Sequence, residues 1–210
     1  MPLRKNGTFT KLAALASLSA ALAVPATAAA SCDESATTKA FAAFGDTADY
    51  SLAPQGDFET GASGWTLKNA KVVDGNETAG VLPGRRSLAL GGGLVPGPSE
   101  AVSPEFCVSE LNPHFRFLVQ AKGPISGLTT FIRFRIGDTP VQLSVPSKVT
   151  ASLRDDWAPS VINPLATRLP LLLLGGSAKV QIVFKATAAG SGFGLGYRID
   201  NVLVDPYRRG

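Results

Sequence analysis

Gly56-Asp57-Phe58-Glu59-Thr60-Gly61, followed by Gly64-Trp65, opens the structured part of the chain, and Ile199-Asp200-Asn201-Val202-Leu203-Val204 closes it. Between these two signatures lies a string of short apolar runs that are separated by Gly and Pro. Turn residues at such short intervals are typical of strands rather than helices. The two signatures therefore predict one β domain in which the Phe58-Glu59 segment and the late strand Ile199–Val204 lie side by side.

The apolar runs recur about every ten residues, which is the strand spacing of a sandwich or barrel. Several alternate with period two; Phe115, Phe117 and Val119 share one face of their run. One buried and one wet face is typical of antiparallel sandwich strands. The 22 Gly and 15 Pro residues disfavour a helical domain. The sequence predicts an all-β, antiparallel two-sheet sandwich with strands at 65–73, 87–90, 114–122, 129–136, 141–145, 171–174, 179–186 and 196–204.

Residues 1–30 are typical of a secretory signal peptide. Basic residues precede an apolar, Ala/Leu-rich stretch from Leu12 to Val24, and Ala28-Ala29-Ala30 supplies small residues for cleavage. The stretch is shorter than the roughly 20 residues of a transmembrane helix. We expect a helical signal, a secreted protein of the cell exterior or envelope, and no transmembrane segment in the mature chain. An N-terminal membrane anchor is the alternative.

Cleavage after residue 30 leaves 180 residues (210 − 30), which is the size of one domain. Residues 31–55 form a polar, Ala-rich leader, and residues 56–210 form the β-sandwich domain. Lys39 to Phe44 has room for one helical turn. The large apolar residues of the leader are expected to lay it across the domain: Phe41, Phe44, Tyr50 and Leu52.

The net charge of +4 falls to about +1 (4 − 3), because three cations and no acids lie in the signal. A nucleic-acid-binding domain normally carries a concentrated excess of basic residues. The mature composition therefore argues against a nucleic-acid partner.

The only cysteines are Cys32 and Cys107. An even pair in an exported chain predicts one disulfide bond. The bond would close a loop of 75 residues (107 − 32), which would stabilise the fold by about 4 kcal/mol in the chain-entropy model. The alternative is a lipoprotein, since Ala29-Ala30-Ser31-Cys32 loosely resembles the motif that precedes a lipidated cysteine.

No catalytic constellation stands out. His114 is the only histidine, and no Gly-x-Ser-x-Gly elbow is present, which argues against a Ser-His-Asp hydrolase. The adjacent acids Asp155 and Asp156 would point to opposite faces of a strand, so they cannot flank one glycosidic bond. We predict no catalytic residues and no enzymatic activity.

Sugar-binding proteins usually present exposed aromatic rings with a few polar groups around them. Trp65 follows a turn glycine and is predicted to be a core residue, and Trp157 is also expected to be packed. The candidates for ligand binding on a wet sheet face are Arg116, Arg133, Arg135 and Tyr197. The alternative role for the arginines is ion pairing with acids on the surface.

The pairs Phe58-Glu59 and Gly64-Trp65, together with Asp200-Asn201-Val202, resemble the galactose-binding-domain-like jelly rolls, the fold of many carbohydrate-binding modules. The leader resembles those of small exported bacterial proteins. The jelly-roll resemblance implies a structural calcium ion held by Glu59 and Asp200, and calcium favours such hard oxygen ligands. The alternative is that both carboxylates only accept backbone hydrogen bonds where the terminal strands meet.

The function that the sequence favours is secreted, non-catalytic binding of a carbohydrate or cell-envelope glycan. A structural or protein-interaction role at the cell surface is the alternative, and a glycan hydrolase is the least favoured. The expected partners are therefore a glycan or a cell-surface protein.

Overall fold

The structure is a computed structural model. It describes residues 36–91, 97–112, 114–122, 127–136, 138–145, 156–165, 169–170, 174, 176–186 and 196–205, and only the backbone of Lys122. The predicted signal peptide, Cys32 and most of the predicted strand 171–174 lie outside these residues. The disulfide and the alternative lipidation of Cys32 therefore stay predictions.

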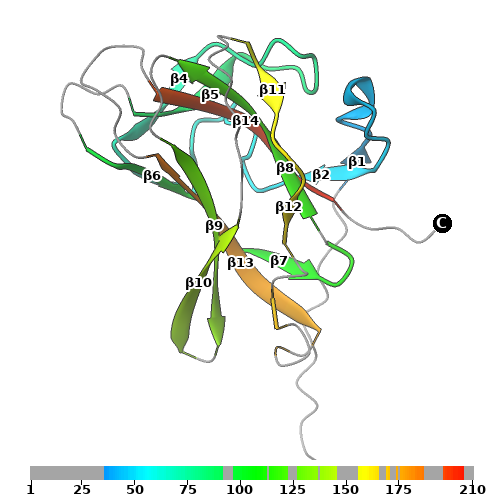
Figure 1. The fold of residues 1–210 in the computed structure, drawn as a ribbon, viewed down its shortest axis with the longest axis vertical. Helices are drawn as coiled ribbons and strands as arrows, with labels where there is room; N and C mark the ends of the chain where they lie inside the picture. Colours follow the sequence, from blue (N-terminus) through cyan, green and yellow to red (C-terminus); the bar gives the residue numbers. More distant parts are fainter. Residues whose placement is uncertain are drawn as a thin grey trace, which may run out of the picture.

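The described strands form two antiparallel sheets packed face to face, so the predicted β-sandwich is confirmed (Figure 1). In the eight-stranded sheet the order is β1-β2-β14-β5-β4, and β8 joins β14 to β11 and β12. In the six-stranded sheet the order is β10-β9-β13-β6-β3, with β7 beside β13. The strands of the eight-stranded sheet are β1 (Thr37–Thr38), β2 (Tyr50–Leu52), β4 (Ala70–Asp74), β5 (Arg86–Leu90), β8 (His114–Lys122), β11 (Ala158–Pro159), β12 (Asn163–Pro164) and β14 (Gly196–Asp205). Those of the six-stranded sheet are β3 (Thr66–Lys68), β6 (Ser99–Val102), β7 (Phe106–Ser109), β9 (Leu128–Ile136), β10 (Thr139–Val145) and β13 (Ser177–Ala186).

One predicted strand, 65–73, is in fact two strands in different sheets. Asn69 has a positive φ of 47°, and its side-chain amide donates to the carbonyl of Pro98 at 3.1 Å. The chain turns there, so β3 joins the six-stranded sheet and β4 joins the eight-stranded sheet. Asparagine tolerates this left-handed conformation better than most residues, which makes it suited to the switch.

The two terminal signatures meet as predicted. Val202 donates its N–H to the carbonyl of Gly56 at 3.0 Å, and its own carbonyl accepts the N–H of Ala53 at 2.9 Å. A Cβ on Gly56 would lie 2.7 Å from the Val202 carbonyl oxygen, so only glycine fits this close approach.

A β-bulge at Asn201, which has a φ of 47°, resets the alternation of β14. Ile199 and Val202 both lie in the core between the sheets, although they are three positions apart. Leu203, in contrast, lies in a second cluster. The extra residue allows one strand to supply two separate apolar layers.

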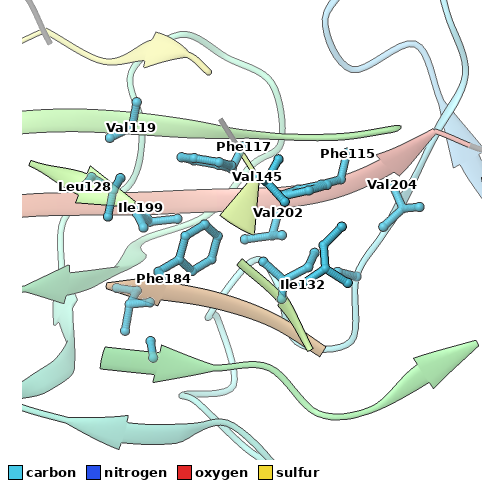
Figure 2. Packing of buried hydrophobic residues seen from close by; sticks show 14 of the residues in the cluster. Phe115, Phe117, Val119, Leu128, Ile132, Val145, Phe184, Ile199, Val202 and Val204 are labelled. Atoms are coloured by element: carbon cyan, nitrogen blue, oxygen red, sulfur yellow. The ribbon is translucent and has the colours of Figure 1, made fainter. Parts of the chain in front are cut away.

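The main core fills the space between the sheets (Figure 2). Phe117 from β8 contacts Phe184 from β13 edge to face, with ring centroids 4.9 Å apart. Trp65 is 7% exposed, and its ring stacks against Phe184 at 6.2 Å. The prediction that Trp65 is a core residue is therefore confirmed.

The second cluster covers the outer face of the eight-stranded sheet. The leader forms β1, a short 3₁₀ helix at Ala42–Phe44, and β2, which pairs with β14. Phe41 and Tyr50 are fully buried against each other, with ring centroids 5.0 Å apart. The cluster comprises Ala40, Phe41, Tyr50, Leu118, Trp157 and Leu203. The leader and Trp157 therefore cover much of this face, whereas Lys71 of β4 stays exposed on it and Arg198 of β14 stays half-buried.

No helix within the described residues is long and apolar enough to span a membrane.

Candidate ligand-binding face

The outer face of the six-stranded sheet carries polar side chains and is not covered by the leader, which packs on the other sheet. On β9, Thr130, Ile132 and Phe134 are buried, whereas their neighbours Phe131 and Arg133 are half-buried. This period-two alternation places the second set on the outer face. We call this surface the polar sheet face.

The strand registers show which outward side chains are neighbours. Phe131 lies directly across from Ser144 on β10 and Val183 on β13. The adjacent row on one side contains Gln142, Arg133 and Gln181. The row on the other side contains Thr129, Lys185, Glu100 and Lys68.

Glu100 holds the charged groups of this face in place. Its carboxylate forms an ion pair with Lys185 Nζ at 2.9 Å, and Arg133 Nη2 lies 3.7 Å from its other oxygen. Arg133 Nη2 also donates to Gln142 Oε1 at 3.1 Å. The side chains of β6, β9, β10 and β13 therefore form one linked polar network.

Phe131 is the aromatic residue among the described outward positions of this face, and Lys185 Nζ lies 5.2 Å from its ring centroid. Beside it in the same cross-strand row, Val183 and Val102 also point outward, and both are buried. A partly exposed ring with fixed donors and acceptors around it suits a polar ring-shaped ligand.

Two of the predicted ligand-binding residues lie on this face. Arg133 is half-buried on β9, and Arg135 is exposed and donates to the Asp138 carbonyl at 2.5 Å. The prediction that Arg116 and Tyr197 lie on a wet face is wrong, because they are only 8% and 4% exposed.

Arg116 points outward from β8, but the leader covers it. Nη1 donates to Asp46 Oδ2 at 2.6 Å, and Nε and Nη2 donate to the Ser160 carbonyl at 3.2 and 2.9 Å. Its guanidinium carbon lies 4.5 Å from the Phe41 ring centroid. Arg116 therefore fastens the leader and the Ser160 loop to the sheet.

Tyr197 belongs to the main core. Burial raises the pKa of its hydroxyl, and hydrogen bonds from the backbone N–H groups of Gly127 and Leu128 partly offset the rise. The side chain therefore joins β14 to the start of β9 rather than facing a ligand.

Sequence reasoning missed Phe131, Glu100 and Lys185. Phe131, Arg133 and Arg135 are each two positions apart, so they lie on the same face of β9. The alternation along this strand could therefore have predicted that Phe131 points outward. Glu100 lies on β6, which spans only four residues, Ser-Glu-Ala-Val, and is too short to show a clear alternation.

The predicted calcium residues lie where the chain ends meet. Glu59 Oε1 accepts the backbone N–H groups of Arg85 and Arg86, both at 2.8 Å. The carboxylate of Asp200 is fully buried and accepts the N–H groups of Glu77 at 3.1 Å and Asn201 at 2.8 Å.

A third carboxylate, that of Glu77, was missed from the sequence. It is 5% exposed and caps its own loop. One oxygen accepts the N–H of Val81 at 2.6 Å, and the other accepts that of Gly80 at 2.9 Å. Burial raises the pKa of Asp200 to about 7; its two backbone hydrogen bonds oppose this rise, and the negative charges of Glu77 and Glu59 add to it.

Among the described residues, no group of three or more Asp, Glu, His or Cys side chains is gathered to hold a metal ion. The oxygens of Glu59, Glu77 and Asp200 instead face backbone N–H donors, which is the alternative role for Glu59 and Asp200. Calcium binding by Glu59 and Asp200 stays a prediction.

The raised pKa of Asp200 predicts how stability depends on pH. The folded state holds its proton up to about pH 7, whereas the unfolded state releases it near 3.8. The contribution of Asp200 to the free energy of unfolding is therefore complete below about pH 4. It is lost as the pH rises towards 7, by up to about 4 kcal/mol. In EDTA, urea unfolding at pH 4.5, 6 and 8 should show this loss, and Asp200→Asn should flatten it.

Calcium, if it binds, prefers the ionised carboxylate, so its addition should raise the melting temperature at pH 8 more than at pH 5. Glu59→Gln should abolish that rise, whereas Glu105→Gln, which changes an exposed acid elsewhere, should not. If millimolar calcium at pH 8 does not change the melting temperature, calcium binding by Glu59 and Asp200 is contradicted. Their role is then to accept backbone hydrogen bonds.

No protein-family model and no curated protein matches the sequence. Solved structures with a similar fold include the CBM22-1 xylan-binding domain of Paenibacillus barcinonensis Xyn10C, at 14% identity and a TM-score of 0.49, with 73% of this chain and 93% of that one covered. The family 11 carbohydrate-binding module of Clostridium thermocellum has 13% identity and a TM-score of 0.43, with coverages of 77% and 98%.

The enzymatically active domain of bacteriophage CBA120 tailspike protein 4 is also similar, at 17% identity and a TM-score of 0.45. The match covers 73% of this chain but only 21% of the tailspike chain. Identities this low, with TM-scores below 0.5, carry no argument about a ligand or an activity. The strand pairing by itself shows an antiparallel two-sheet β-sandwich, in which the leader and Trp157 cover much of one outer face and the other outer face is the polar sheet face.

Proposed function

We propose that this protein binds a glycan, without catalysis, on the polar sheet face around Phe131. The observation that carries the proposal is the contrast between the two outer faces. The leader and Trp157 cover much of the outer face of the eight-stranded sheet. The six-stranded sheet instead presents an aromatic ring between rows of polar side chains.

The described contacts support this use of the face. One side of a pyranose ring is rich in C–H groups, which favours contact with the apolar ring of Phe131. The hydroxyl groups need donors and acceptors at fixed positions, and Glu100, Arg133 and Gln142 supply both. Because these groups already hold one another, binding orders few side chains and costs little conformational entropy.

The compartment fits the proposal. Residues 1–30 predict export, and glycans of cell envelopes lie outside the cytoplasm. The proposal therefore keeps the predicted secretion and a glycan partner at the cell surface.

A glycan-array and polysaccharide pull-down screen on the exported protein tests the proposal. For a glycan that binds, Phe131→Ala should weaken affinity about tenfold, since a central aromatic contact commonly contributes more than 1 kcal/mol. Phe44→Ala is the matched control, because Phe44 is a 41% exposed aromatic in the leader. Binding unaffected by Phe131→Ala, or a screen with no bound glycan, would overturn the proposal.

A further inference from the structure

We infer that the glycan bound by the polar sheet face is an acidic polysaccharide, one that carries carboxylate groups on its sugar rings. The inference rests on the proposed glycan-binding function and concerns the charge of the ligand. The observation behind it is an excess of cations on this face.

The outward positions of the six-stranded sheet are rich in basic residues. They lie on three strands, β3, β9 and β13, and comprise Lys68, Arg133, Arg135, Lys179 and Lys185. Glu100 is the only carboxylate among the described outward strand positions of this sheet. It is shared between Lys185 and Arg133. Within the described residues, Lys68, Arg135 and Lys179 have no ion pair, so the face keeps a positive charge.

This charge is a property of the face and not of the whole protein. The chain without its predicted signal is close to neutral, at about +1. On the eight-stranded sheet and in the leader, cations and acids occur together: Asp46 pairs with Arg116, and Asp205 lies 3.7 Å from His114.

The cations flank the aromatic ring on both sides. Phe131 lies in one cross-strand row with Val183. Lys185 lies in the row on one side, and Arg133 lies in the row on the other. Outward residues that are two apart on a strand are about 7 Å apart. A sugar stacked on Phe131 would therefore place the substituents of its neighbours beside cations in either direction along the chain.

A neutral glycan has no charged group with which these cations could pair. An acidic polysaccharide carries carboxylates at intervals along its chain, and these could form ion pairs with the cations. Guanidinium groups bind carboxylates with two parallel hydrogen bonds, and two of the cations are arginines. Nucleic acid is the competing polyanion, but the near-neutral mature chain argues against it.

Affinity electrophoresis of the exported protein in polygalacturonate, and in the same polymer with its carboxylates methyl-esterified, tests the inference. We expect at least tenfold tighter binding to the free acid, and loss of that preference between 20 and 500 mM NaCl because salt screens exposed charges. Arg135→Gln and Lys179→Gln should each weaken binding about two- to fivefold, the range expected for an exposed ion pair. Lys71→Gln, which removes an exposed cation of β4 on the other sheet, should change nothing.

Equal binding of the two polymers, or no effect of Arg135→Gln and Lys179→Gln, would overturn the inference. If a neutral glycan binds in a Phe131-dependent way and polygalacturonate does not, the inference fails and the proposed function stands. If no glycan of either charge binds, both fail. Tighter binding of single-stranded DNA than of polygalacturonate at 150 mM NaCl would also overturn the inference in favour of phosphate recognition.

Discussion

Replacing Trp65 with alanine should lower the free energy of unfolding by about 3–5 kcal/mol. The indole lies between Phe58 and Phe184, with ring centroids 5.1 and 6.2 Å away, and is only 7% exposed. Its Nε1 donates to the Pro54 carbonyl at 3.1 Å, so alanine would leave both a cavity and an unpaired acceptor. Urea unfolding followed by circular dichroism measures the loss.

Phe44→Ala is a control for this change, because Phe44 is an exposed aromatic and should cost much less. Near-unchanged stability of Trp65→Ala, together with loss of ligand binding, would reverse the assignment and make the indole a binding platform.

Replacing Arg116 with methionine should also lower the free energy of unfolding by about 3–5 kcal/mol, because it breaks a buried ion pair on one side only. Arg116 and Asp46 side chains are 10% and 17% exposed and lie 2.6 Å apart. The variant would leave the Asp46 carboxylate and the Ser160 carbonyl without their guanidinium donors. It should also loosen the leader, which hydrogen–deuterium exchange of residues 36–52 would detect.

A second substitution, at the partner residue Asp46, is the control for Arg116→Met. Burial would raise the pKa of Asp46, but hydrogen bonds from Tyr50, Ala48 and Arg116 outweigh it and hold the pKa below its usual range. Its ionised form therefore stabilises the protein above about pH 4 and ceases to do so as the pH falls. Adding Asp46→Asn to Arg116→Met should recover part of the loss at pH 7. A loss below about 1 kcal/mol for Arg116→Met would contradict a fastening role.

The sequence predicted the long strands best, since alternation over many residues is a strong signal. The strand predicted at 114–122 has the bounds of β8, and those at 129–136, 179–186 and 196–204 match β9, β13 and β14 within two residues. Strands β11 and β12 were missed because each spans only two residues and contains a proline. The division of 65–73 at Asn69 was missed because it depends on a backbone angle rather than on hydrophobicity.

The candidate site was predictable in part. Arg133 and Arg135 could be placed on a wet face, because the buried residues of their own strand alternate with them. Arg116 shows the same alternation, yet its Asp46 partner is 70 residues away in the leader, so local pattern could not reveal that it is covered. A strand's alternation separates its two faces, but tertiary packing determines which of them meets solvent.

Mapping backbone amide chemical shifts by NMR during titration with a bound glycan, once a screen has supplied one, locates the ligand on the molecule. The proposal expects the largest changes in β6, β9, β10 and β13, centred on Phe131 and its cross-strand neighbours, with β4, β5 and β14 nearly unchanged. Changes centred on the eight-stranded sheet or the leader, with β9 and β13 silent, would contradict binding at the polar sheet face.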